Sequence, residues 1–322
     1  MSKVAMKFLV TGANGFVGSA LCGELSQRNY PVLGAVRAEH AECACFERAV
    51  VGEIDEKTNW ATALTGIDIV IHLAARVHVM QDDSTNPLAE FRKVNVAGTE
   101  NLARSAAASG ATRFVYVSSI KVNGEETHGS KRFTEEDIPS PQDPYGVSKC
   151  EAEQVLQRVA TETGLEFVIV RPPLVYGAGV KGNFAQMLKV LASGIPLPLA
   201  SVDNLRSLVY VGNLVDALIL CATHPAAAGQ TYLISDGEDI STPDLLIQLG
   251  AAMGHPARLF SCPLALLKLA GRLIGKKNQM ERLLSLLRVD DSKIRRELGW
   301  IPTYTLQDSL SKTAKQLFAL AQ

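Results

Sequence analysis

The sequence predicts an α/β protein with a doubly wound parallel sheet and a smaller lobe at its C-terminal end. Two observations predict the sheet. Apolar runs of strand length alternate with helical patterns through the first 177 residues, and the first run ends in a glycine-rich turn. A third observation predicts the lobe, because the later sequence turns to helices with short strand pieces. We therefore expect one domain over residues 1–177 and a mainly helical lobe over residues 178–322, with segments that interleave.

Length, charge and cysteine content exclude several classes of protein. A chain of 322 residues can bury a large core, and 32 basic against 33 acidic residues leave no overall field that would attract nucleic acid. The six cysteines are scattered without a C-x-x-C pair, which predicts reduced thiols and no metal site. No apolar run reaches membrane-spanning length and the start lacks a signal peptide, so we expect a cytoplasmic protein.

The first apolar run, residues 7–12, leads into a glycine-rich turn and then a helical pattern to about Asn29. Glycines spaced G-x-x-G-x-x-G let the chain turn sharply and let its backbone approach a pyrophosphate at the helix N-terminus. A triplet placed between a first strand and a first helix predicts a dinucleotide site in a Rossmann-type sheet. The residues expected to bind the cofactor here are Gly12, Asn14, Gly15, Phe16, Val17 and Gly18.

The second strand, residues 31–36, ends at Val36 and is followed by Arg37. An acidic residue at this position would bind the ribose 2′-hydroxyl of NAD, whereas a guanidinium can pair with a 2′-phosphate. This favours NADP(H) over NAD(H), the alternative being a solvated arginine. A third strand at about residues 48–54 would place Glu53 and Ile54 beside the adenine.

The fourth strand, residues 66–75, carries His72 inside an apolar run, which predicts a core histidine. Leu73, Ala74 and Ala75 are small enough for a cofactor to lie over the strand's carboxyl end, and Arg76 begins a loop that could reach substrate, as could His78. In the helix expected over residues 87–110, Asn95 could reach sheet backbone near the cofactor.

The fifth strand ends in Ser118 and Ser119, and a polar loop over residues 121–143 leads to a helix over residues 145–163. Tyr145 and Lys149 lie one turn apart on the same face of that helix. Such a set suits a carbonyl/alcohol redox step. The phenol moves the proton, a serine binds the same oxygen, and the ammonium lowers the phenol's pKa.

Five segments together resemble the extended short-chain dehydrogenase/reductase superfamily, within it the nucleotide-sugar epimerase/dehydratase/reductase group. They are Thr11–Gly18, Val70–Ala75, Val115–Ser119, Tyr145–Lys149 and Arg171–Gly177. The resemblance implies an NAD(P)-binding first domain and a substrate-binding lobe. It implies catalysis by Ser119 (or Ser118), Tyr145 and Lys149, with Tyr145 and Lys149 on the nicotinamide ribose and Pro172 near the nicotinamide. It further implies a UDP-sugar diphosphate held by Asn183 and Arg206, and a possible homodimer through helices 87–110 and 144–163.

Departures from the group's patterns narrow the expected reaction. The 4,6-dehydratases carry Thr-Asp-Glu where this chain has Ser119-Ile-Lys, which argues against water elimination. The run from Ser119 to Glu125 also resembles bacterial reductases that act on a UDP-linked 4-keto-6-deoxy-N-acetylhexosamine. Together with Arg37, this resemblance implies an NADPH-dependent 4-ketoreductase of a UDP-4-keto-6-deoxy-(N-acetyl)hexose in surface-polysaccharide synthesis. The alternative is a UDP-hexose or UDP-N-acetylhexosamine 4-epimerase with bound NAD. A reductase of a non-nucleotide ketone and a redox-sensing binding protein are further alternatives.

Residues 262–288 are apolar with interspersed Lys268, Arg272, Lys276 and Lys277. This pattern is shared by helices that lie on a membrane surface and by helices that pack within a domain. The sequence favours a packed pair of domain helices.

Overall fold

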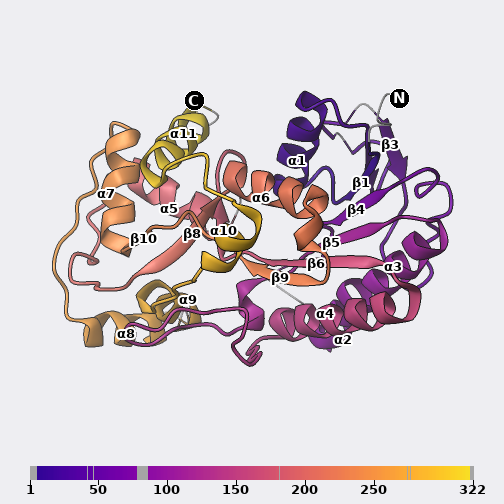
Figure 1. The fold of residues 1–322 in the computed structure, drawn as a ribbon. Coiled ribbons are helices and arrows are strands. Elements are labelled where there is room, and N and C mark those ends of the chain that lie inside the picture. Colours follow the sequence, from indigo (N-terminus) through magenta and orange to yellow (C-terminus); the bar gives the residue numbers. More distant parts are fainter. Residues whose placement is uncertain are drawn as a thin grey trace.

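A parallel sheet of seven strands organises the larger part of the molecule (Figure 1). The computed structural model describes residues 6–41, 43–45, 47–77, 86–180, 182–273, 275 and 277–319. The strands run in the order β3-β2-β1-β4-β5-β6-β9, and every pairing is parallel. Their bounds are Phe8–Thr11 (β1), Val32–Val36 (β2), Glu47–Val50 (β3), Ile69–His72 (β4), Arg113–Val117 (β5), Glu166–Arg171 (β6) and Gln230–Leu233 (β9).

Helices cover both faces of this sheet, because successive strand residues point to opposite sides. Val10 packs with α1 (Phe16–Gln27) and α6 (Val211–Thr223) on one face. Leu9 packs on the other face with α3 (Gly98–Ala108) and α4 (Pro144–Thr163). Figure 1 shows the two layers, with α2 (Pro87–Arg92) beside α4. This confirms the predicted doubly wound α/β class.

A second sheet of three strands, in the order β10-β8-β7, organises the smaller lobe. Its strands are Leu174–Tyr176 (β7), Arg206–Tyr210 (β8) and Asp239–Ile240 (β10). The helices of the lobe are Asn183–Ala192 (α5), Thr242–Ala252 (α7), Leu264–Leu273 (α8), Lys277–Leu284 (α9) and Leu306–Ala319 (α11). Tyr176, Leu208, Leu249 and Leu310 belong to its apolar core.

The chain passes between the two parts more than once. Helix α6 and strand β9 follow the first strands of the smaller lobe, yet they complete the large sheet and its covering layer. Helix α10 (Ser292–Leu298) also packs there, through Ile294 and Leu298. The large sheet therefore takes a strand and helices from beyond residue 177.

Three elements differ from the ranges expected from the sequence. The third strand ends at Val50, so Glu53 and Ile54 lie in the loop that follows it. The fourth strand spans only Ile69–His72. The long helix expected over residues 87–110 is divided by a π-helical turn, η1 (Lys93–Ala97), which carries the buried Asn95. A π turn inside a helix often marks a functional position.

Candidate active site

The turn between β1 and α1 is shaped as a backbone cradle. Gly12 has a φ of +66°, and a Cβ there would lie 3.0 Å from the backbone nitrogen of Ala74. A Cβ on Gly18 would lie 2.0 Å from the carbonyl oxygen of Gly12. Gly15 precedes α1 without a side-chain cap, so the first N–H groups of the helix remain available to an anion. The cradle thus fits the pyrophosphate of a dinucleotide.

The end of β4 forms the neighbouring wall of this cradle. The backbone N–H groups of Leu73 and Ala74 each donate to Thr11 Oγ1, at a distance of 3.2 Å. Asn95 holds the chain two residues later, since its side chain accepts from the Arg76 N–H at 2.8 Å and donates to the Arg76 carbonyl at 3.1 Å. The structure therefore places Leu73 to Arg76 and Asn95 together at the carboxyl edge of the sheet, where ligands of such folds bind.

His72 is a core residue, as the sequence predicts. Its Nδ1 lies 2.6 Å from Thr11 Oγ1 and its Nε2 lies 3.1 Å from Thr99 Oγ1. Complete burial, with the nearby Lys149 charge, lowers the pKa of His72 to about 3. The ring is therefore neutral at physiological pH and serves the packing under the site.

Tyr145 lies in the first turn of α4, and the sequence around it fixes that turn. Asp143 is the N-cap and accepts from the Gly146 N–H at 2.7 Å, while Pro144 occupies the first helical position. Burial raises the pKa of Tyr145 to about 12; the charge of Asp143 adds to the rise, and a hydrogen bond with Ser119 opposes it. The phenol is thus neutral near pH 7.

Lys149 lies one turn further along α4 and is buried. Its Nζ donates to the Val117 carbonyl at 2.7 Å and lies 4.2 Å from the centre of the Tyr116 ring. Burial lowers the pKa of Lys149 to about 7, against the opposing effect of Glu153. We expected this ammonium to hold the pKa of Tyr145 down. In this structure the pKa of Tyr145 is raised instead: burial and the charge of Asp143 raise it, and the group that opposes them is Ser119 rather than Lys149.

The two serines after β5 have different surroundings. Ser119 is hydrogen-bonded to Tyr145 and accepts from the Lys121 N–H at 3.3 Å, capping the short helix η2 (Ile120–Val122). Ser118 Oγ is buried and has no hydrogen-bond partner within the described ranges. Ser119 is therefore the hydroxyl that the fold brings to Tyr145. The carbonyl of Pro172 accepts from the Ile120 N–H at 3.0 Å, which brings Pro172 beside Ser119.

Two ion-pair clusters near the site were not predicted from the sequence. Lys121 pairs with Asp143 and, at 2.9 Å, with Glu125. Arg171 donates to both carboxylate oxygens of Glu153, at 2.9 and 2.6 Å, and both side chains are at most 7% exposed. The sequence signal that could have revealed the second cluster is Arg171 within an apolar strand, together with Glu153 one turn after Lys149. This second pair joins α4 to β6.

Two of the residues expected to bind substrate, Arg76 and Arg206, can be placed in the structure. Arg76 lies 5.6 Å over the ring of Phe91, whose centre is 6.1 Å from that of Tyr145. Arg206 begins β8 and donates to the carbonyl and the hydroxyl of Ser285, each at 3.2 Å. Asn183 begins α5, but its side chain, like the whole of His78, lies outside the described part.

Arg37 follows β2 and forms an ion pair with Glu53, with 3.3 Å between Nη1 and Oε1. Both side chains are about 70% exposed, at 73% and 69%. The guanidinium predicted to read a 2′-phosphate therefore has a carboxylate beside it.

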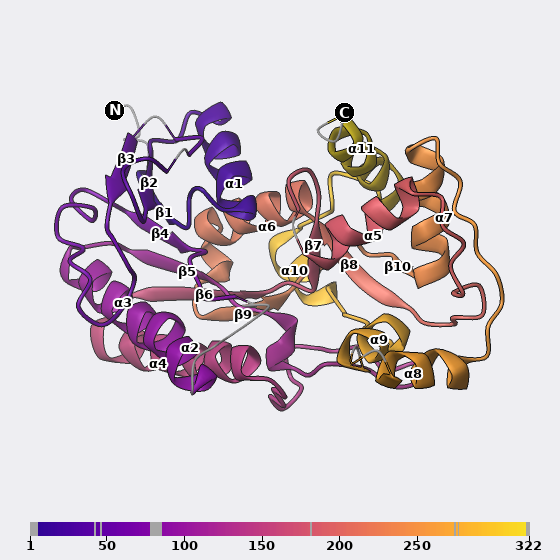
Figure 2. The same ribbon diagram turned by 180° about the vertical axis from the view of Figure 1, so that it is seen from behind.

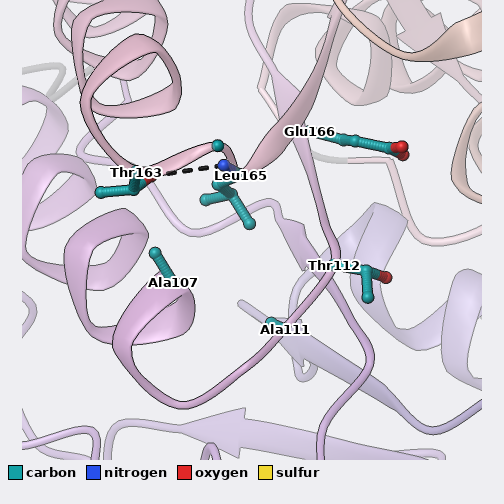
Figure 3. A pocket seen from close by; sticks show the side chains of 7 residues that line it. Ala107, Ala111, Thr112, Thr163, Leu165 and Glu166 are labelled. Atoms are coloured by element: carbon teal, nitrogen blue, oxygen red, sulfur yellow. Dashed lines mark hydrogen bonds between the residues drawn. The ribbon is translucent and has the colours of Figure 1, made fainter.

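A hollow at the opposite edge of the sheet is distinct from this site (Figure 3). Its lining comes from the amino ends of β5 and β6 and the ends of the helices before them; it includes Ala107, Thr112, Thr163 and Glu166. Catalytic groups of doubly wound sheets gather at the carboxyl ends of the strands, so this hollow has no part in the site. In the ranges described, no His, Cys, Asp and Glu side chains form a metal-binding group, and no helix could span a membrane.

Comparisons with known proteins agree with this geometry. The chain is 44% identical over 319 residues to a UDP-glucose 4-epimerase of Vibrio cholerae, covering 97% of this chain and 96% of that protein. The fold matches a UDP-glucose 4-epimerase of Thermotoga maritima, solved with UDP-glucose, with a TM-score of 0.78 at 22% identity. It matches a UDP-glucuronic acid 4-epimerase of Bacillus cereus, in complex with NAD, with the same two values. Both alignments cover 98% of this chain and 100% of the other. Residues 8–235 match a family profile, and the resemblance read from the motifs is confirmed: the chain belongs to the NAD dependent epimerase/dehydratase family.

Proposed function

We propose that this protein is a nucleotide-sugar 4-epimerase acting on a UDP-hexose or UDP-N-acetylhexosamine. The observation that carries the proposal is the hydrogen-bonded Ser119–Tyr145 pair beside the glycine cradle, with Lys149 one turn behind. The extended similarity to a UDP-glucose 4-epimerase supports the same assignment. Lys121 stands where dehydratases carry an acid and is engaged by Asp143 and Glu125, which supports the exclusion of water elimination.

The residues divide the chemistry at the sugar's C4 between them. A dinucleotide in the cradle would supply the hydride acceptor and donor at C4. As a phenolate, Tyr145 takes the proton from the C4 hydroxyl, and as the phenol formed in this way it returns that proton after the sugar has turned, while Ser119 hydrogen-bonds the same oxygen. Lys149 lies one turn behind the phenol on α4 and, with Tyr145, would contact the nicotinamide ribose. Pro172 would lie near the nicotinamide, and Asn183 and Arg206 would hold the diphosphate.

NAD is the dinucleotide that we propose for this site. The absence of a carboxylate directly after β2 favoured NADP(H), but Glu53 stands 3.3 Å from Arg37. A carboxylate at that place would repel a 2′-phosphate and could accept from a ribose hydroxyl. The family to which the chain belongs supports NAD as well.

Turnover without added cofactor tests the proposal. We expect purified protein to interconvert UDP-glucose and UDP-galactose, or their N-acetylated forms, and to release NAD when it is denatured. Tyr145→Phe should reduce kcat at least about a hundredfold while the protein keeps its NAD, because only the proton transfer is lost. Ser119→Ala should reduce kcat as well, and the matched change Ser118→Ala should leave it nearly unchanged.

The second candidate is the 4-ketoreductase that the sequence favoured. It is supported by the neutral phenol of Tyr145, whose raised pKa suits a proton donor, and by the exposed Arg37. One-for-one consumption of NADPH with a UDP-4-keto-6-deoxy-N-acetylhexose, without interconversion of 4-epimers, would overturn the epimerase proposal in favour of this one.

A further inference from the structure

Helix α8 (Leu264–Leu273) is packed on the smaller lobe by a narrow line of contact. Of its residues, Leu267 and Gly271 are buried, one turn apart. Leu266, Leu269 and Leu273 are 55%, 51% and 79% exposed. Leu264, at the start of the helix, is 41% exposed as well. Single exposed leucines are common on protein surfaces, but four on one short helix form a patch that needs a reason.

The three most exposed of these leucines share one face of α8. Positions 266, 269 and 273 follow the spacing i, i+3 and i+7, so the three side chains form a stripe along the helix. Lys268 and Arg272 lie one turn apart on the flank between this stripe and the buried line, and both are exposed. Phe260, 50% exposed, precedes the helix by one turn's length of chain. The helix thus presents an apolar stripe beside a row of cations.

The charge around this helix is unlike that of the chain as a whole. Between residues 262 and 288 there are six basic residues and a single acidic one, Glu281, whereas the whole chain has a net charge of −1. The basic residues are Lys268, Arg272, Lys276, Lys277, Arg282 and Arg288, of which Arg288 is paired with the buried Asp239 and leaves five for the count of cations. An apolar stripe within so cationic a segment is complementary to an anionic membrane surface, which has negatively charged headgroups above an apolar interior.

We propose that α8 is the element by which this protein docks on an anionic lipid membrane. Leu266, Leu269 and Leu273 enter the boundary between headgroups and acyl chains, and Lys268 and Arg272 contact the lipid phosphates. A second copy of this chain is the weaker occupant, because a two-fold contact would bring two cationic segments together. The attachment is peripheral and goes beyond the proposed epimerase activity.

Helix α8 belongs to the lobe that carries Arg206, one of the residues expected to bind substrate. Both views place α8 and α9 at the lower end of the smaller lobe (Figures 1 and 2). The end of α9 is bonded to this lobe, since the carbonyls of Leu283 and Ser285 accept from Asn204, and that of Ser285 accepts from Arg206. Docking through α8 would therefore hold the lobe that carries Arg206 against the membrane.

Flotation with vesicles tests the proposal on the full chain. We expect the wild type to float with vesicles of phosphatidylcholine and phosphatidylglycerol, to float less as salt is added, and to stay behind with phosphatidylcholine alone. The triple variant Leu266→Gln/Leu269→Gln/Leu273→Gln and the double variant Lys268→Glu/Arg272→Glu should each bind at least about tenfold more weakly. The control Ile138→Gln/Ile247→Gln/Ile301→Gln changes three exposed isoleucines elsewhere, of 87%, 52% and 73% exposure, and should bind as the wild type does.

Turnover and circular dichroism show whether each variant is folded, since none of these residues lies in the site. Equal vesicle binding by the wild type and the triple leucine variant would overturn the proposal. The proposal would also be overturned if the wild type did not bind anionic vesicles but formed a dimer in light scattering, and if the leucine changes dissociated that dimer.

Discussion

At Lys149, burial and a neighbouring carboxylate act in opposite directions on one ammonium group. Burial disfavours the charge, Glu153 favours it, and burial prevails, so that the pKa falls to about 7. Tyr145 has the opposite relation, because burial and the charge of Asp143 both disfavour its phenolate. The phenol of Tyr145 and the amine of Lys149 are thus both held mainly in their neutral forms above pH 7.

Lys149 makes a defined contribution to the pH dependence of stability. Between its pKa of about 7 in the folded protein and its ordinary value of 10.5, the unfolded chain binds one more proton at this side chain. Raising the pH through this window therefore favours the folded state, by up to about 1.4 kcal/mol per pH unit. We expect the free energy of unfolding to rise from pH 7 to 10 relative to that of Lys149→Met, measured by urea denaturation. Parallel curves would contradict this.

The negative charge of Asp143 contributes to the raised pKa of Tyr145. Asp143→Asn keeps an acceptor for the helix cap but removes the negative charge that raises that pKa. The pKa should fall, and the limb of the kcat profile that needs the phenolate should move by roughly half a unit or more to lower pH. Asp137→Asn, in the same loop but without effect on Tyr145, is the control, and an equal shift in both variants would contradict the assignment.

At the scale of the element, α1 combines two glycines with different tasks. Gly18 has no room for a side chain, whereas a Cβ on Gly23 would meet no atom within 4 Å. The first is required by the close approach of helix and turn, and the second is a helix-interior glycine that costs stability.

Gly18→Ala and Gly23→Ala form a matched pair. We expect Gly18→Ala to lose about 2 kcal/mol of stability and most dinucleotide binding, because the turn must move away from its cradle conformation. Gly23→Ala should gain about 0.5–1 kcal/mol and bind normally. Thermal denaturation and fluorescence titration with NAD measure both quantities, and equal behaviour of the two variants would refute the distinction.

The elements that the sequence predicted are those whose pattern is local. The glycine spacing, the apolar strands and the Tyr145–Lys149 spacing each lie within one short stretch, and the structure places these segments at one edge of the sheet. The π turn around Asn95 depends on bonds to Arg76 and Ser148, which are distant in sequence. Strand β9 has four residues, and it is a strand because β6 lies beside it. Such features depend on tertiary contacts, so periodicity could not reveal them.

At the scale of the whole molecule, Asp239 joins segments that are far apart in the chain. Its side chain is 6% exposed and accepts from Arg132 at 2.6 Å, Arg288 at 2.8 Å and Ser207 at 2.6 Å. These partners come from the loop before α4, the segment after α9 and strand β8. A buried carboxylate shared by two guanidinium groups fixes the smaller lobe against the loop that leads to Tyr145.

Asp239→Asn should therefore destabilise the whole protein. The two arginines would lose their shared counter-charge, at a cost of about 3 kcal/mol in the free energy of unfolding. The neighbouring change Glu238→Gln alters an exposed carboxylate and should cost less than about 0.5 kcal/mol. Urea denaturation measures both, and a loss in Asp239→Asn no larger than in Glu238→Gln would contradict this account.

The late position of β9 in the chain bears on how the protein is made. Strand β6 pairs with β9 on its outer side, and that partner ends at Leu233. Until this residue has left the ribosome, a nascent chain holds six strands whose last edge is open to pairing with other chains. A product truncated near residue 177 would keep that open edge permanently. Early termination within this gene should therefore yield aggregates rather than a smaller working domain.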